Sequence, residues 1–155
     1  MARKAAKTET GRAGEVALDA YTKLVRATES STSRIHQHLA DVNLTISQFG
    51  VLEALHHLGP LCQKDLAEKI LKTSGNLTMV IENLEKRSLV SRERDQTDRR
   101  SLNISLTEKG RKLIAQLFPK HAAIVAKEMS ILSPAEQATL ARLCQKLGLR
   151  LKSND

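Results

Sequence analysis

At 155 residues the chain is long enough for one domain with a substantial core, and its formal net charge of +8 favours a polyanionic partner such as nucleic acid, with plain solubility as the simpler explanation. Only Tyr21, Phe49 and Phe118 are aromatic, which argues against base stacking on single strands and leaves duplex DNA. No apolar run is long enough to span a membrane, no secretory signal is visible, and two cysteines are too few for a disulfide framework, so a cytoplasmic protein is expected.

The N-terminal part is expected to begin with a tail and a helix. Residues 1–14 are basic and rich in small residues, which predicts a disordered tail. From Val16 to about Leu39 apolar residues recur at helical spacing around a polar centre. The next helix has clear ends, because Thr45-Ile46-Ser47-Gln48 forms a capping box and Gly59-Pro60 is a helix stop.

Two short helices and a hairpin are expected next. The first spans Leu61 to Leu71 with Cys62 as its N-cap, and a polar turn at residues 73–75 follows. The second runs from Asn76 to about Ser88, and its apolar stripe consists of Leu77, Val80, Ile81 and Leu84. Two β-prone runs, Leu89 to Arg94 and Leu102 to Leu106, then flank a charged tip.

The remainder is expected to be helical. Thr107 caps a helix that tolerates an early Gly110 and is kinked at Pro119. Ser133 to Glu136 is a second capping box, and the last helix carries an apolar stripe of Leu140, Leu143, Leu147 and Leu151. Because few aromatic residues are available to fill one core, the helices at the two chain ends are expected to pair with a second copy, the alternative being that they fold back on their own domain.

Three helices followed by a hairpin make a winged helix, in which the second helix of the helix-turn-helix enters the major groove. Small polar side chains there suit base edges, and lysines suit phosphates. The expected DNA-binding residues of this helix are Lys72, Thr73, Ser74, Asn76, Thr78 and Lys86. At the hairpin tip, Arg99 and Arg100 suit a narrow minor groove, and Asp98 is placed to direct Arg100. The simpler explanation of the polar helix face is contact with solvent, and the simpler explanation of the charged hairpin tip is a solvated run of charges.

The segments LTISQFGVLEAL, DLAEKI, SGNLTMVIENLEKRSLV and DRRSLNISLTEKG together resemble the MarR family of bacterial transcription regulators, over about residues 40–115. The resemblance implies a mainly α fold with a small β-hairpin wing, as a winged helix-turn-helix with N- and C-terminal dimerisation helices. It places one domain at residues 15–155, with a DNA-binding lobe over 45–106 and dimerisation helices over 15–40 and 107–151. It also implies a homodimeric repressor that a small ligand or an oxidant releases from a pseudo-palindromic operator.

Further residues are candidates for regulation. The resemblance implies a ligand pocket among the first helix, the second helix and the helix after the wing, for which the candidates are His38, Phe49, His56 and Phe118, with a phenol or quinone as effector. Cys62 is a candidate redox residue because a thiol at a helix N-terminus oxidises readily, although a small residue that merely fits is the alternative. No metal site or cofactor is expected, since no cysteine or carboxylate completes a tetrahedral set around the histidines. Ser88 stands where the family has glycine, which suggests a slightly different helix end.

Two other classes of function compete with that of a DNA-binding regulator. A winged-helix module whose basic face docks an acidic protein would share the same elements, and steep salt dependence of specific DNA binding separates the two. An enzyme is not expected, because the chain lacks a glycine-rich phosphate loop, a nucleophile–histidine arrangement and paired acids in a cleft-like context.

Overall fold

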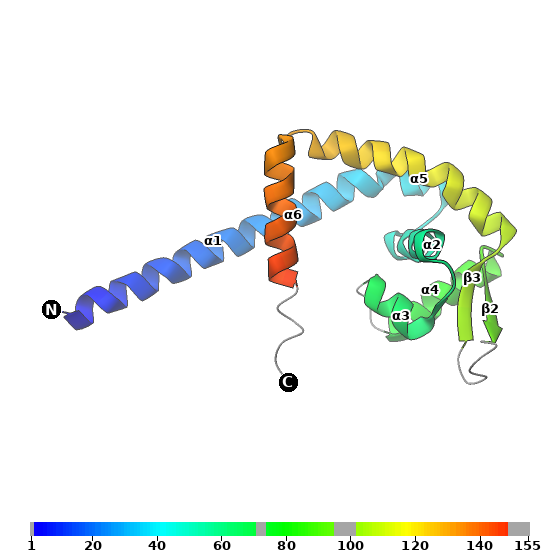
Figure 1. Cartoon of the computed structure of the whole chain (residues 1–155), viewed down its shortest axis with the longest axis horizontal. Coiled ribbons are helices and arrows are strands. Elements are labelled where there is room, and N and C mark those ends of the chain that lie inside the picture. The colour runs from blue at the N-terminus through cyan, green and yellow to red at the C-terminus, as the bar shows by residue number, and fades with distance from the viewer. Residues whose placement is uncertain (1, 71–73, 95–101, 149–155) are drawn as a thin grey trace. The chain divides into compact units, whose positions relative to one another are not determined.

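The fold is mainly helical with a small antiparallel sheet, as predicted (Figure 1). The computed structural model describes residues 2–70, 74–94 and 102–148, and the side chains within 11–70, 76–94 and 102–148. Its elements are α1 (Ala2–His36), η1 (Gln37–Val42), α2 (Ile46–Leu58), β1 (Leu61–Cys62), α3 (Gln63–Lys69), α4 (Ser74–Lys86), β2 (Val90–Arg94), β3 (Leu102–Leu106), α5 (Glu108–Met129) and α6 (Pro134–Gly148). They form two compact units, residues 1–37 and 38–155. In the described part of the chain no helix is both long and apolar enough to cross a membrane.

The first unit consists of α1, which begins at Ala2 and so includes residues for which composition predicts a tail. That segment is rich in alanine, lysine and arginine, which have high helix propensity. The polar centre does not interrupt the helix, because its hydroxyls bond to the preceding turn. Thr28 Oγ1 donates to the Leu24 carbonyl at 2.8 Å, and Ser31 Oγ donates to the Ala27 carbonyl at 2.7 Å.

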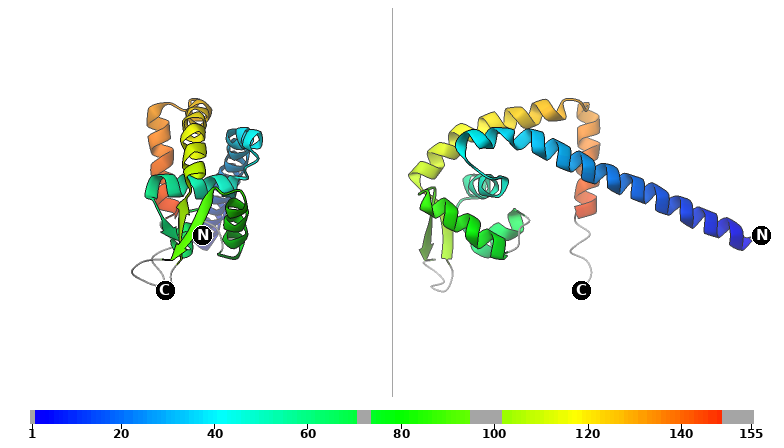
Figure 2. Two further views of the ribbon diagram at one scale, coloured as in Figure 1. Left: turned by 90° about the vertical axis from the view of Figure 1, so that its right-hand side faces the viewer. Right: turned by 180° about the vertical axis from the view of Figure 1, so that it is seen from behind.

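In the second unit α2 is the central helix, with α5 on one side and α4 on the other (Figure 2). Its predicted capping box is confirmed, since Thr45 Oγ1 accepts from Gln48 N at 3.2 Å and Gln48 Oε1 accepts from Thr45 N at 2.9 Å. The helix ends at Gly59, whose φ of 78° lies in the left-handed region that favours glycine. Its apolar face forms the centre of the core, whose fully buried members include Phe49, Val51, Leu52, Leu66, Leu77, Ile81, Leu84, Ile104 and Ile114.

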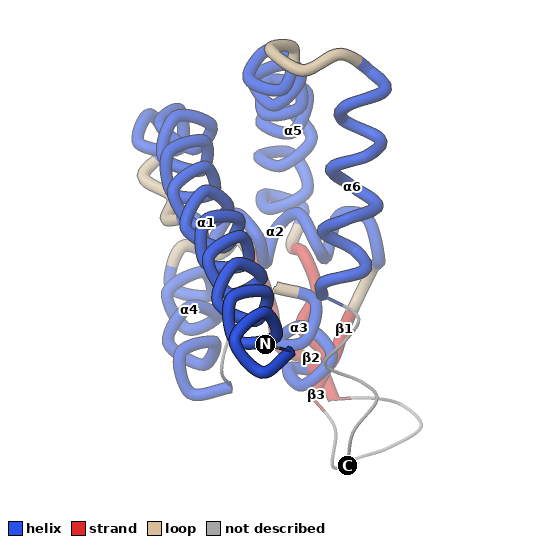
Figure 3. Tube along the Cα trace, turned by 90° about the vertical axis from the view of Figure 1, so that its left-hand side faces the viewer, coloured by secondary structure: helices blue, strands red, loops and turns tan. Residues whose placement is uncertain are grey.

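The described sheet has three strands in the order β1-β3-β2, where the sequence predicts only the hairpin. Leu61 lies opposite Ile104 and Cys62 opposite Asn103, so Leu61, where the helix was expected to begin, is in a strand instead. The second edge of β3 provides the hydrogen-bonding partner for this short strand, which the local sequence pattern does not reveal. Helix α3 then begins at Gln63, with Cys62 as its N-cap as predicted. Figure 3 shows the three strands gathered at one end of this unit, beside α3.

Gly110 allows α5 to approach the chain between α4 and β2. A side chain at this buried position would place its Cβ on the Leu89 carbonyl oxygen and 3.3 Å from Leu106 Cδ2. Thr107, the predicted N-cap, reinforces the contact: its backbone N–H donates to the same carbonyl at 3.1 Å. The helix tolerates Gly110 as predicted, and packing against Leu89 requires glycine here, a reason that the sequence pattern does not show.

Helices α5 and α6 complete the second unit. Helix α5 continues through Pro119, and its buried face consists of Gly110, Ile114, Leu117 and His121. The predicted capping box of α6 is confirmed, and hydrogen bonds from the Ser133 backbone N–H and hydroxyl to Glu136 hold the pKa of that carboxyl below its usual value. None of the residues in α6 is buried in this chain, and the helix turns away from the end of α5 (Figure 1).

Replacing Gly110 by alanine should destabilise the protein by about 1–3 kcal/mol, because the new methyl group must displace the Leu89 carbonyl or α5. Gly50→Ala is the matched control: its Cβ would lie 3.7 Å from Ile70 Cγ2, and the better helix propensity of alanine should stabilise by about 0.5–1 kcal/mol. Urea unfolding followed by circular dichroism measures both changes. Equal stability of Gly110→Ala and wild type would contradict the packing argument.

Candidate nucleic-acid interface

Helix α4 has the two faces expected of a recognition helix. Leu77, Ile81 and Leu84 are fully buried, which confirms most of the predicted stripe, while Val80 is only partly buried. The helix begins at Ser74, two residues before the predicted start, because Ser74 and Gly75 occupy the first turn, where backbone N–H groups have no helical partner in any case.

The other face of α4 carries the predicted DNA-binding residues that the structure describes. Asn76 and Lys86 are exposed, whereas Thr78 is half-buried and its hydroxyl accepts from Gln63 Nε2 at 2.7 Å. Gln63, whose hydrogen bond links α3 to α4, was not identified from the sequence. Ser74 lies in the first turn of α4 without a described side chain. The remaining candidates lie outside the described residues: Lys72, Thr73, Asp98, Arg99 and Arg100.

The C-terminus of α4 is fixed by a Schellman turn. Ser88 N donates to the Glu85 carbonyl at 2.7 Å and Leu89 N donates to the Leu84 carbonyl at 2.9 Å. Ser88 itself has a φ of 57°, which explains why glycine is expected here and why α4 ends at Lys86 instead of near Ser88.

Two side chains tie this end of α4 to its surroundings. The guanidinium of Arg87 donates to the Val42 carbonyl at 3.0 Å and the Asn43 carbonyl at 2.6 Å. Arg92 on β2 lies 3.3 Å from Glu85 on α4, and both side chains are more than two-thirds buried. The base of the hairpin is therefore held against α4 by an ion pair that solvent screens only in part.

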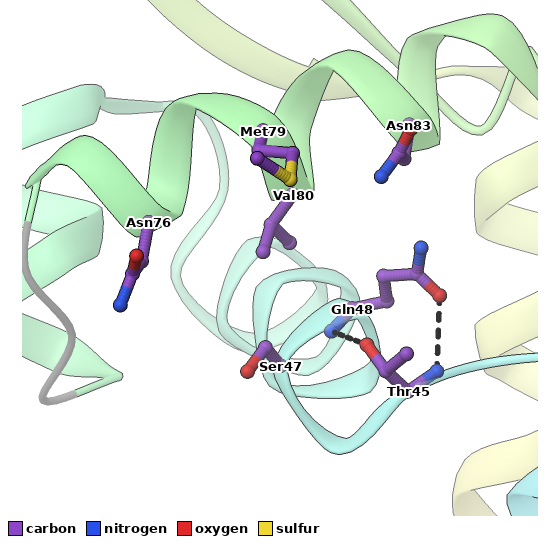
Figure 4. Close-up of a pocket in the computed structure, with 7 residues that line it drawn as sticks. All are labelled: Thr45, Ser47, Gln48, Asn76, Met79, Val80 and Asn83. Carbon is purple, nitrogen blue, oxygen red and sulfur yellow. Dashed lines mark hydrogen bonds between the residues drawn. The ribbon is translucent and has the colours of Figure 1, made fainter.

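Helices α2 and α4 enclose a groove of about 370 Å³ on the exposed side of α4 (Figure 4). In Figure 4 Asn76, Met79 and Asn83 follow one another along α4, and the first turn of α2 lies below them. The described lining residues are uncharged: Thr45, Ser47, Gln48, Asn76, Met79, Val80 and Asn83.

The candidate pocket residues fall into two groups. His38 and Phe49 lie together, with ring centroids 6.3 Å apart, and His56 lies with Phe118 at 6.1 Å. His121 joins the first group, 4.5 Å from Phe49 and 5.3 Å from His38. It was missed although it follows Leu117 by four residues on the buried face of α5, a spacing visible in the sequence.

The two groups differ in exposure. His38, Phe49 and His121 are buried between η1, α2 and α5, whereas His56 is exposed on α2. A pocket formed by all four predicted residues stays a prediction.

Among the described residues no group of three or more metal-binding side chains occurs. Cys62 is a half-buried free thiol whose sulfur lies 3.4 Å from Asp65 N.

Known proteins are similar to this chain in both sequence and fold. The MarR family model matches residues 44–102. The transcriptional regulator MhqR of Bacillus subtilis is 34% identical over 138 residues, which cover 89% of this chain and 95% of MhqR. The chain belongs to the MarR family. It is therefore a DNA-binding transcription regulator with a winged helix-turn-helix, and its relatives form a non-enzymatic class.

Solved structures of MarR-type proteins agree with this fold. BpsR of Bordetella bronchiseptica, whose DNA binding is regulated by 6-hydroxynicotinic acid, is 30% identical with a TM-score of 0.75, over 85% of this chain and 91% of BpsR. The MarR family regulator AbsC of Streptomyces coelicolor has a TM-score of 0.81 over 88% of this chain and 95% of its own, and its 24% identity shows likeness of fold alone.

Replacing Ser88 by glycine should stabilise the protein by about 0.5–1 kcal/mol, because glycine adopts the left-handed conformation of the α4 C-terminus without steric cost. Ser88→Ala is the matched control and should bring no gain, since it retains the Cβ. Thermal unfolding of the three proteins measures the difference. A Ser88→Gly variant no more stable than Ser88→Ala would show that the backbone is not strained here.

Proposed function

We propose that this MarR family protein is a homodimeric repressor that binds a pseudo-palindromic operator through α4 and the hairpin tip. The observation that carries the proposal is the exposed polar face of α4, on a helix whose residues Leu77, Ile81 and Leu84 are fully buried and whose C-terminus is tied to η1 and β2. A helix held in this way meets the requirement for reading base edges from a rigid element.

Each candidate residue has a proposed role. Asn76 contacts a base edge, and Lys86 contacts a phosphate near the end of α4. Thr78 lies deeper, and Gln63 orients its hydroxyl. Lys72, Thr73 and Ser74 bind DNA phosphates and bases near the first turn of α4. Arg99 and Arg100 enter the adjacent minor groove, with Asp98 directing Arg100.

A second copy of the chain is the proposed partner of the apolar residues on the terminal helices. On and beside α6 the exposed fractions are 88% for Ile131, 50% for Leu143 and 59% for Leu147. On α1, Val16, Leu18 and Tyr21 are also exposed. Residues 15–40 and 107–151 would then form the dimer around two lobes over 45–106, and two-fold symmetry would place two α4 helices about 34–36 Å apart, one turn of DNA.

A small aromatic acid or phenol is the proposed effector. NadR, 25% identical with a TM-score of 0.71, is known in complex with 4-hydroxyphenylacetate, and 6-hydroxynicotinic acid regulates BpsR. Both molecules combine an aromatic ring with polar groups, which suits the rings of His38, Phe49 and His121. Oxidation of Cys62 at the α3 N-terminus is the alternative route of release.

Binding to the DNA upstream of its own gene tests this function. If α4 and the hairpin contact several phosphates on each half-site, the affinity should fall by about a thousandfold or more between 50 and 200 mM salt and resist scrambled competitor. Arg100→Ala should weaken binding at every salt concentration without changing the oligomeric state. Gel-shift titrations measure the affinities. Weak binding that is equal for all sequences would contradict the repressor and favour docking of an acidic protein.

Leu143→Glu should convert the dimer to a monomer, because it places a charge in the apolar face of α6. Gln145→Glu is the matched control, since it adds the same charge at an exposed polar position of the same helix and should leave the dimer intact. Sedimentation velocity measures the mass of each variant. A Leu143→Glu protein that remains dimeric would exclude this face of α6 from the interface.

A further inference from the structure

Met79 is exposed on the polar face of α4. Its exposed fraction of 66% is the highest among the large hydrophobic side chains described between residues 38 and 130. The other large apolar residues of the helix point into the core and are buried or partly buried. Exposure of this apolar side chain to water is unfavourable, so a partner that covers Met79 would gain free energy.

The neighbours of Met79 indicate what that partner is. Asn76 and Asn83 flank it at spacings of three and four residues, which puts all three on one side of the helix (Figure 4). The groove beside them has an uncharged lining. A phosphate or an acidic protein would require cations here, whereas the edges of A·T base pairs require amide groups and an apolar contact.

The chemistry of the stripe matches A·T pairs directly. An asparagine amide forms two hydrogen bonds with adenine N6 and N7, and the thymine C5-methyl group takes apolar contacts. Methionine is flexible and polarisable, so its side chain can adjust to a methyl group in the groove. Asn76 and Asn83 are seven residues apart along the helix, a rise of about 10 Å, which corresponds to about three base-pair steps.

We propose that Met79 contacts a thymine methyl group in the major groove, with Asn76 and Asn83 directed at adenine edges on either side, so that α4 selects A·T pairs within each half-site. The proposal rests on the proposed function, since it requires α4 to enter the major groove. It adds two specificity residues, Met79 and Asn83, to those predicted from the sequence.

Single-atom changes in the DNA test this contact. A binding site is first selected from random duplexes with the wild-type protein, and each thymine is then replaced in turn by deoxyuridine, which lacks only the methyl group. Loss of one buried methyl contact should weaken wild-type binding about fourfold at one or two positions of each half-site. Met79→Ala should bind the thymine and uracil forms of that position equally, and Met79→Leu should still discriminate.

The control variant is Glu82→Ala, which changes an exposed neighbour on α4 and should keep the wild-type ratio of thymine to uracil binding. Circular dichroism establishes that each variant is folded. Equal wild-type affinity for every uracil-containing site, or an unchanged ratio in Met79→Ala, would overturn the role of Met79 while leaving the repressor in place. Failure to select any site would instead overturn the proposed function, and this inference with it.

Discussion

The contact between the Leu89 carbonyl and Gly110 determines how the DNA-binding surface is presented. The same carbonyl accepts the Thr107 N–H, so the end of α4, the start of α5 and the two hairpin strands meet at one point. Ser88 turns the chain from α4 into β2 with a left-handed backbone, and the ion pair between Glu85 and Arg92 holds β2 against the end of α4. The polar face of α4 therefore has one orientation relative to the wing, which reading of a groove requires.

The described surface of α4 has an uncharged middle and a charged end. Its middle is uncharged, with Asn76, Met79 and Asn83 in line, while Lys86 lies near its end. A net charge of +8 supplies long-range attraction to any duplex, which carries no sequence information. In the proposed complex, discrimination would come from the neutral stripe, where hydrogen bonds and apolar contacts can distinguish one base pair from another.

Features set by neighbouring residues were predictable from the sequence. The caps at Thr45, Thr107 and Ser133 and the buried stripe of α4 each depend on side chains within a few positions of one another. Features set by distant residues were not. Strand β1 exists because β3 offers a free edge some forty residues later, and Gly110 is required because Leu89 approaches it. For the site, Asn76 and Thr78 were predicted by residue type, whereas the contact of Gln63 with Thr78 and the exposure of Met79 are known only from the packed structure.

Dimethyl sulfate footprinting tests most directly whether α4 lies in the major groove of an operator, because the reagent methylates guanine N7 in that groove. On a selected site that carries guanines next to the A·T pairs of each half-site, binding of the full-length protein should protect guanine N7 in two patches about one helical turn apart. Guanines that stay fully reactive throughout a saturated, sequence-specific complex would contradict that placement of α4, since a helix in the major groove covers that atom.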